Sequence, residues 1–172
     1  MAKLQAQRRP QEIPWPPYSV IDGARDRSIS PQLAASALKH ASLYEGHAAE
    51  ELGAFGPYLV EASTSTGIAA LTGFAPSCLH LLSDASFNTV RQHLRHFLTV
   101  KLGNGRRVHF RFYDPRVLRR FLPTCLPDEW TSFFGPIDAF IVEGDGDERS
   151  EMLKFSRDDH GRLPTRVKFA CR

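Results

Sequence analysis

The sequence has little cysteine, no long apolar run and almost no excess of charge of either sign. Its three cysteines, Cys78, Cys125 and Cys171, are too widely spaced for a zinc-binding pattern or a disulfide framework, so a reducing compartment is the simplest setting. No stretch approaches the roughly 18 apolar residues of a membrane-spanning helix. Residues 1–17 contain no apolar stretch of signal-peptide length. We therefore expect a cytoplasmic protein that does not enter a membrane.

The charge balance argues against a dedicated nucleic-acid-binding domain. The chain of 172 residues has 22 basic and 19 acidic residues, and its formal net charge is +3. Domains that bind nucleic acid typically carry a larger and more segregated positive excess. Hydrophobic residues make up 42% of the chain, which is enough for one ordinary domain with a core of its own.

The common signatures of catalysis are also missing. The sequence has neither the G-x-S-x-G motif that carries the nucleophilic serine of many hydrolases nor a G-x-x-x-x-G-K-[ST] phosphate loop. His93 and His96 can share one helix face, but no acidic residue or cysteine stands nearby at a diagnostic ligand spacing. Cys78 and His80 would point to the same side of a strand, and a buried free cysteine is far commoner than a catalytic one. We expect no enzymatic activity, no cofactor and no metal site.

The pattern of elements predicts an α/β fold, with α+β as the alternative: a single domain with a mixed β-sheet flanked by helices. Residues 1–17 read as a flexible proline-rich arm, 18–144 as the core and 145–172 as a short extension that forms a β-hairpin. Residues 63–77 fit a short helix or a loop. The expected strands are 18–24, 42–46, 57–62, 77–84 and 139–144, the expected helices are 28–40, 47–56, 84–98, 115–122 and 127–135, and hairpins are expected at 99–113 and 151–170.

The stretch GRRVHFRFYDPRVLRRFL, residues 105–122, combines arginines and aromatic residues at unusual density. If the strand continues to Tyr113, side chains alternate between its two faces, and Phe112 points towards the core. Asp114 is then placed to cap a helix and Pro115 to be its first residue, which makes a strand-to-helix corner. Arg111 needs a carboxylate if it is buried, and Asp22 at the end of the first core strand is the expected partner.

Several segments of the chain resemble one known family. YSVIDGARD, SLYEG, GPYLVE, RQHLRHFLTVKL, FRFYDPRVLRRFLP and FFGPI occur in order, and the resemblance runs from about Tyr18 to Ile141. They resemble the adaptor-chaperone family of bacterial type VI secretion systems, and the F-R-F-Y-D-P-R-V element is the most specific of them. The resemblance implies a non-enzymatic cytoplasmic protein that binds an effector toxin. It also implies that the protein helps to load the toxin onto the spike protein, the valine-glycine-repeat trimer, by contact with the spike's tail.

Two groups of residues are candidates for a structural motif or a partner-binding site, and the oligomeric state stays open. Asp22 and the corner are the first group, as a structural motif or as partner contacts. Exposed aromatic residues beside prolines and the arginines of the last helical turn are the second, because such side chains often anchor protein interfaces. For Trp15 the alternative is that its ring folds back on its own domain. The first group is Asp22, Arg111, Tyr113, Asp114, Pro115 and Arg116, and the second is Trp15, Tyr18, Arg119 and Arg120.

A module that binds nucleic acid through a basic patch is the alternative. Eight basic residues fall within one third of the chain with aromatic residues between them, an arrangement that can track a phosphate backbone and stack on bases. The same surface suits an acidic protein partner. These residues are Arg91, Arg95, Lys101, Arg106, Arg107, Arg116, Arg119 and Arg120.

Overall fold

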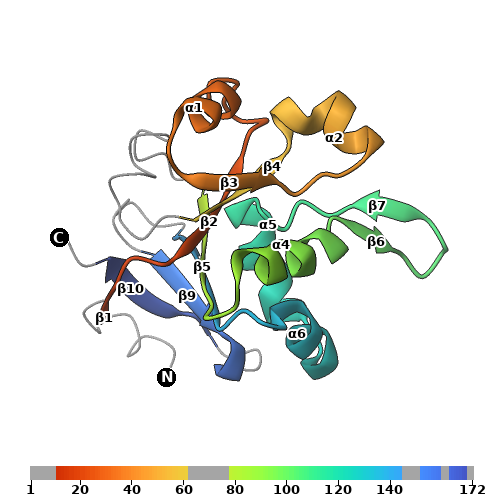
Figure 1. Ribbon diagram of the computed structural model, residues 1–172. Coiled ribbons are helices and arrows are strands. Elements are labelled where there is room, and N and C mark those ends of the chain that lie inside the picture. Colours follow the sequence, from red (N-terminus) through yellow and green to blue (C-terminus); the bar gives the residue numbers. More distant parts are fainter. Residues whose placement is uncertain (1–10, 62–77, 145–151, 160–162, 170–172) are drawn as a thin grey trace.

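The computed structural model describes residues 11–61, 78–144, 152–159 and 163–169, and most of them surround one eight-stranded sheet (Figure 1). Its strand order is β1-β10-β9-β8-β5-β2-β4-β3, and all neighbours are antiparallel except β1 and β10. This mixed sheet with its flanking helices confirms the predicted architecture. The strands are β1 Gln11–Ile13, β2 Tyr18–Asp22, β3 Lys39–Ser42, β4 Pro57–Glu61, β5 Cys78–Leu82, β8 Ala139–Glu143, β9 Met152–Ser156 and β10 Thr165–Phe169.

The helices are short, and a separate two-stranded hairpin projects from the body (Figure 1). The hairpin consists of β6 Thr99–Lys101 and β7 Arg107–His109, and Gly105 in its turn has the positive φ of 82° expected of an Asn-Gly turn. The helices are α1 Ile29–Ala35, α2 His47–Leu52, α4 Phe87–His96, α5 Pro115–Phe121 and α6 Pro127–Phe134, with 3-10 turns at η1 Gly53–Phe55, η2 Leu122–Thr124 and η3 Arg157–Asp159.

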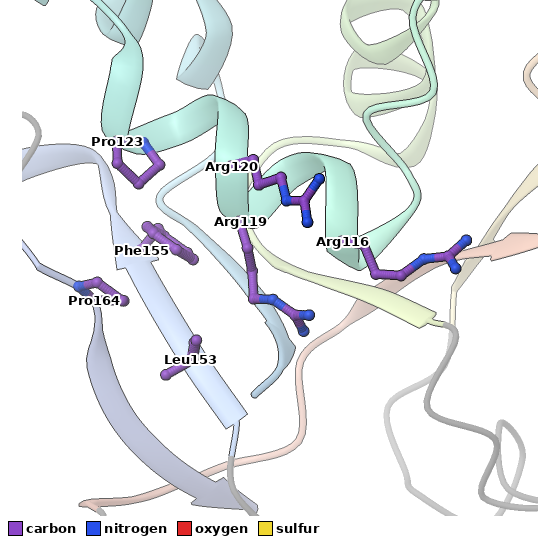
Figure 2. Close-up of a pocket in the computed structure, with 7 residues that line it drawn as sticks. All are labelled: Arg116, Arg119, Arg120, Pro123, Leu153, Phe155 and Pro164. Carbon is purple, nitrogen blue, oxygen red and sulfur yellow. The ribbon is translucent and has the colours of Figure 1, made fainter. Parts of the chain in front are cut away.

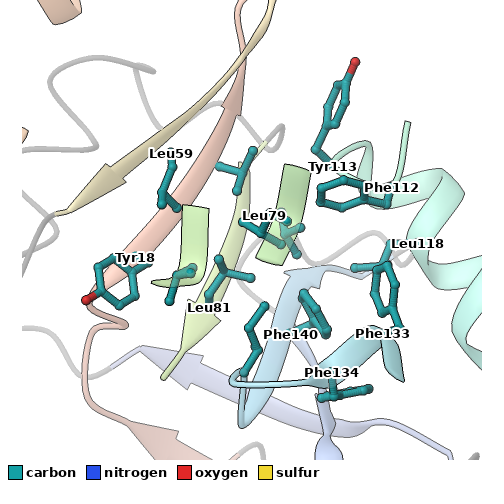
Figure 3. Packing of buried hydrophobic residues seen from close by; sticks show 14 of the residues in the cluster. Tyr18, Leu59, Leu79, Leu81, Phe112, Tyr113, Leu118, Phe133, Phe134 and Phe140 are labelled. Carbon is teal, nitrogen blue, oxygen red and sulfur yellow. The ribbon is translucent and has the colours of Figure 1, made fainter. Parts of the chain in front are cut away.

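The larger core lies between the sheet and helices α4, α5 and α6 (Figure 3). Alternate residues of β2, β5 and β8 supply its sheet side, because side chains along a strand point to opposite faces in turn. Aromatic rings fill the space above them; Phe133, for example, lies 5.0 Å from Phe140, centroid to centroid. Its fully buried members include Val20, Leu79, Leu81, Phe112, Leu118, Phe133, Phe134, Phe140 and Phe155.

The opposite face of the sheet carries two smaller clusters and a neutral polar pair. Helix α1 covers part of this face with Ile29 and Leu33. Between the clusters, the Ser19 hydroxyl lies 2.7 Å from Nδ1 of His80. Burial lowers the pKa of His80 from 6.5 to about 4. This histidine is therefore neutral at physiological pH.

The C-terminal hairpin exists as predicted, but it is an integral part of the main sheet. Strands β9 and β10 pair with each other, β9 also pairs with β8, and β10 pairs with β1. Phe155 and Val167 are buried from it, one in the large core and one on the opposite face. The predicted boundary at residue 145 therefore does not separate an appendage from a complete core.

The predicted flexible arm is corrected over residues 11–17, whereas residues 1–10 lie outside the described residues. Gln11–Ile13 form β1 on the sheet edge, and Ile13 is buried. Trp15 packs against Phe169 at 4.6 Å between ring centroids. The prolines suggested extended backbone, and an edge strand needs extended backbone. The distant partner β10 could not be read from the local pattern.

A second correction concerns the helix predicted over 28–40 and the strand predicted over 42–46. Helix α1 ends at Ala35, because Ser36 turns back: its hydroxyl donates to the Leu33 carbonyl and accepts from the Leu38 amide. The strand then begins earlier, at Lys39, and pairs with β4. Pro31 lies in the third position of this helix, and Ser28 is its N-terminal flanking residue. The expectation for 63–77 lies outside the described residues.

Candidate partner-binding site

The Asp-Pro corner forms as the sequence predicts. Asp114 caps α5, since its Oδ1 accepts a hydrogen bond of 2.9 Å from the Arg116 amide, and Pro115 is the first helical residue. The Arg116 guanidinium also donates two hydrogen bonds to the same carboxylate, from Nε at 3.0 Å and from Nη2 at 2.7 Å. These hydrogen bonds lower the pKa of Asp114 to about 2.

The residues before the corner do not continue the strand, which corrects the predicted alternation. Strand β7 ends at His109, and a turn closes where the Asp114 amide donates to the Arg111 carbonyl at 3.0 Å. Because the chain bends there, Phe112 and Tyr113 are both buried, although alternation would place them on opposite faces. The aromatic density of the motif thus serves the core on both sides of the bend.

Arg111 pairs with Asp22 as expected from the sequence. The Arg111 Nη2 atom lies 2.5 Å from Asp22 Oδ2, and the pair joins the end of β2 to the corner. The Asp22 side chain is 1% exposed, whereas that of Arg111 is 45% exposed. The other oxygen of Asp22 accepts from the Ala24 amide. The buried carboxylate is therefore fully engaged, and the guanidinium keeps much of its contact with water.

A hydrogen-bonded row of Tyr44, His109 and Tyr113 lies beside this pair. His109 Nε2 is 3.1 Å from the Tyr113 hydroxyl and 3.4 Å from the Tyr44 hydroxyl. Burial, followed by the nearby Arg111 charge, lowers the pKa of His109, and burial raises that of Tyr113. At neutral pH His109 and Tyr113 are therefore neutral. Sequence reasoning missed Tyr44 and His109 as members, because the contact joins segments 65 residues apart.

Trp15 and Tyr18, proposed as exposed anchors, lie on opposite sides of the sheet and largely inside the fold. Tyr18 is 6% exposed and donates its hydroxyl hydrogen to the Ala85 carbonyl at 2.8 Å. Trp15 is half-buried, with its ring against His80 and Phe169. Tyr18 is therefore a core residue, and Trp15 packs on its own domain, which is the alternative that the sequence left open.

Arg116, Arg119 and Arg120 line one wall of a pocket of about 400 Å³ (Figure 2). Their spacing of three and four residues along α5 places them on neighbouring positions of one helix surface, a signal that is readable in the sequence. The rest of the lining is Pro123 from η2, Leu153 and Phe155 from β9, and Pro164 before β10. No sequence signal connects the C-terminal residues with the arginines.

Two other arginines of the predicted basic patch have structural partners. Arg91 donates from Nε to the Ser42 carbonyl at 2.9 Å, and Arg95 donates from Nε to the Leu43 carbonyl at 3.1 Å. Both also form ion pairs with Glu45. Arg91 and Arg95 therefore brace the segment after β3, and the continuous basic groove of the alternative prediction is interrupted there.

Among the described residues, no cluster of three or more metal-ligating side chains occurs, and no helix has the length and apolarity to cross a membrane. Cys78 is buried, and burial raises the pKa of the Cys125 thiol to about 11, which makes it a poor nucleophile at neutral pH.

One family model matches the chain, over residues 17–132, and its description is "Domain of unknown function (DUF4123)". The matched span contains Asp22, the corner and all of α5, and it ends within α6. Strands β8, β9 and β10 follow it and complete the sheet. No curated protein and no solved structure matches the chain significantly.

Proposed function

Because the chain belongs to the family described as a domain of unknown function, DUF4123, and also resembles type VI adaptors in its motifs, we propose that it is an effector-loading adaptor. In this proposal it binds an effector toxin in the cytoplasm and helps to place the toxin on the tail of the valine-glycine-repeat spike protein. It acts as a binding protein and has no turnover of its own.

The observation that carries the proposal is the F-R-F-Y-D-P-R-V element with its ordered neighbours from Tyr18 to Ile141. In the fold this element forms a corner that is held by three kinds of contact. Phe112 is buried in the core, Arg111 forms an ion pair with Asp22, and Asp114 forms an ion pair with Arg116. A rigid corner of this kind suits a scaffold that presents its surface to a partner.

The state of the titratable groups supports a binding role over a catalytic one. Asp114 is held as a carboxylate by Arg116, and Asp22 is engaged by Arg111 and a backbone amide. His109 is held between two tyrosine hydroxyls. A general acid or base needs a pKa near the working pH and access to a substrate, and both carboxylates are buried and bonded within the fold.

The test is co-purification of the tagged full-length chain with the toxin encoded by the neighbouring gene, after co-expression. We expect a complex that survives both nuclease treatment and high salt, because aromatic and apolar contacts supply most of the energy of such interfaces. Failure to retain the toxin under gentle conditions would contradict the proposal. A parallel purification with the spike protein tests the second contact.

Nucleic-acid binding is the second candidate, and the projecting hairpin favours it. Lys101, Arg106 and Arg107 are exposed on β6, β7 and their turn, away from the braced arginines of α4. A phosphate-binding surface loses affinity by orders of magnitude between low and physiological salt. A complex that requires nucleic acid and disappears in Arg106→Glu/Arg107→Glu would favour this candidate over the adaptor.

A further inference from the structure

The pocket beside α5 has two walls of different chemistry and different origin. One wall is lined by Arg116, Arg119 and Arg120, and the other by Leu153, Phe155 and Pro164; the Arg119 side chain is the one that extends towards Leu153 in this view (Figure 2). The arginine wall lies within the span that the family model matches, and the apolar wall lies beyond it. The volume of about 400 Å³ is in the range of sites that take small ligands or a few side chains.

The three arginines differ in how far their charge is already compensated. Arg116 is paired with Asp114, and its side chain is 66% exposed. Arg119 donates from Nη1 to the Glu143 carbonyl, which fixes its position without a formal counter-charge in that bond. Arg120 is exposed, and no ion pair or side-chain hydrogen bond of it is found among the described residues. Of these three arginines, Arg116 is the one with an ion pair among the described residues, so the arginine wall presents positive charge to a ligand.

The apolar wall adds a second condition for a ligand, which is an apolar group that can contact it. Leu153 and Pro164 are half-buried, and Phe155 beneath them is 2% exposed. Leu163, next to Pro164, is 76% exposed. Apolar surface beside a basic wall favours a ligand that has an apolar side chain and carboxylates close together.

We propose that this pocket binds an acidic segment of the partner protein, with an apolar side chain against Leu153 and Pro164 and carboxylates against Arg119 and Arg120. The proposal rests on the proposed function for the identity of the partner, the effector toxin. Arginine binds carboxylates in a two-pronged geometry, and the fixed Arg119 is pre-positioned for it. The C-terminal strands then determine which apolar side chain fits.

The same arginines fit a nucleic-acid phosphate less well. Binding of single strands relies on exposed aromatic rings on which bases stack, and the one aromatic ring in the pocket lining, Phe155, is buried beneath its neighbours. The apolar lining offers nothing to a phosphate. We therefore assign the pocket to a peptide and use an oligonucleotide as the competing probe.

The test is fluorescence polarisation of the full chain with a labelled short peptide in which glutamates flank a leucine–phenylalanine pair. One control peptide has glutamine at each glutamate position, and another has serine in place of the apolar pair. We expect both controls to bind at least about tenfold more weakly, a difference of about 1.4 kcal/mol. Equal binding of either control peptide would overturn the proposal, and so would tighter binding of a labelled oligothymidine.

Two variants address the two walls, and one variant controls for charge. Arg120→Glu changes an exposed side chain, and Pro164→Glu places a carboxylate in the apolar wall; each should weaken the acidic peptide by about tenfold or more. Arg107→Glu makes the same charge change on the projecting hairpin and should leave binding unchanged. If Arg107→Glu weakens binding as much as Arg120→Glu, the attraction is general and the pocket assignment is wrong.

The toxin co-purification separates this inference from the proposed function. A toxin complex that is retained by the wild type and lost in Arg120→Glu supports both. A complex that is retained equally by both proteins contradicts the pocket and leaves the adaptor function intact. If the wild type binds the peptide through Arg120 but retains no toxin, the adaptor function fails and the chemistry of the pocket is still supported.

Discussion

The two faces of the sheet bury their polar groups in different ways. On the face covered by α4, α5 and α6, strand β2 ends in Asp22, a charged group paired with Arg111. On the opposite face, Ser19 of the same strand pairs with His80, and both groups are neutral. Two positions of one strand, three residues apart, thus present a charge to one side and an uncharged pair to the other.

The difference follows from access to water. Asp22 stands at the strand end, where the 45% exposed Arg111 compensates it and stays partly hydrated. His80 lies mid-strand beneath the rings of Trp15 and Phe169, at 5.2 and 5.1 Å between centroids. A charge there would lose its hydration, and among the described residues His80 has no ion pair with a carboxylate, so burial favours the neutral ring.

The largest expected effect is the loss of stability when His80 becomes protonated. Its pKa of about 4 in the folded protein lies below the ordinary 6.5, so the unfolded chain binds the proton first as the pH falls. The contribution of neutral His80 to the free energy of unfolding is complete above pH 6.5. It decreases as the pH falls to about 4, by about 3 kcal/mol in total. Urea unfolding between pH 7 and pH 4 measures it.

The matched variant for this prediction is Ser19→Ala/His80→Leu, which removes both members so that neither is left buried without a partner. This part of the pH dependence should disappear in that variant. In His96→Gln, which changes an exposed histidine on α4, it should persist. An unchanged slope in the double variant would show that His80 is not the group responsible.

The charged face should respond next, and the response should be asymmetric. Arg111→Ala leaves the buried Asp22 carboxylate without its cation, whereas Asp22→Ala leaves a guanidinium that can turn to water. Breaking a fully buried pair costs about 3–5 kcal/mol; with Arg111 half-exposed we expect about 2 kcal/mol for Arg111→Ala and less for Asp22→Ala. Thermal unfolding of both variants checks the order.

The same two variants also test where Arg111 acts. Equal melting temperatures for the wild type and both variants would contradict a stabilising pair. If stability is unchanged but the toxin complex is lost, Arg111 belongs to the interface. Arg107→Ala, which removes an exposed arginine from the neighbouring strand, is the control for loss of a positive charge.

The contacts that the sequence predicted were those with a local or chemically unique partner. Asp114 and Pro115 form a cap because their spacing to the helix is fixed by the chain itself. The Asp22–Arg111 pair was predicted because few acidic residues lie at the end of an apolar strand. Strand and helix types were readable wherever the apolar period was clear, as in Phe87, Val90 and Leu94 of α4.

The contacts that the sequence did not predict depend on distant partners. The β1 strand has three residues, and only its alignment beside β10 makes it a strand. The end of α1 depends on one serine, Ser36, whose hydroxyl donates to the backbone carbonyl of Leu33. The Tyr44–His109 contact and the apolar wall of the pocket each bring together segments with no shared pattern. Such pairings are a property of the assembled sheet, and no local rule contains them.

The smallest effect on stability is expected at Asp114, the other buried carboxylate beside the helices. It tests whether the local Asp114–Arg116 pair behaves like the long-range Asp22–Arg111 pair. Asp114→Asn keeps an oxygen that can cap α5 but loses the charge that Arg116 holds, whereas Asp114→Ala loses the cap as well, at about 1 kcal/mol. The pKa of Asp114 is lowered to about 2, so its ionised form contributes stability above about pH 4, and this contribution is lost as the pH falls through 2. The difference in unfolding free energy between the wild type and Asp114→Asn should therefore be small at pH 6 and should vanish towards pH 2.

The loss of stability in Asp114→Asn should also be smaller than that in Arg111→Ala. Arg116 is the more exposed of the two arginines, and the Asp114–Arg116 pair joins residues only two positions apart. Equal losses for Asp114→Asn and Arg111→Ala would mean that both carboxylates depend on their arginines to the same degree, and that the long-range pair has no special part in joining β2 to the corner.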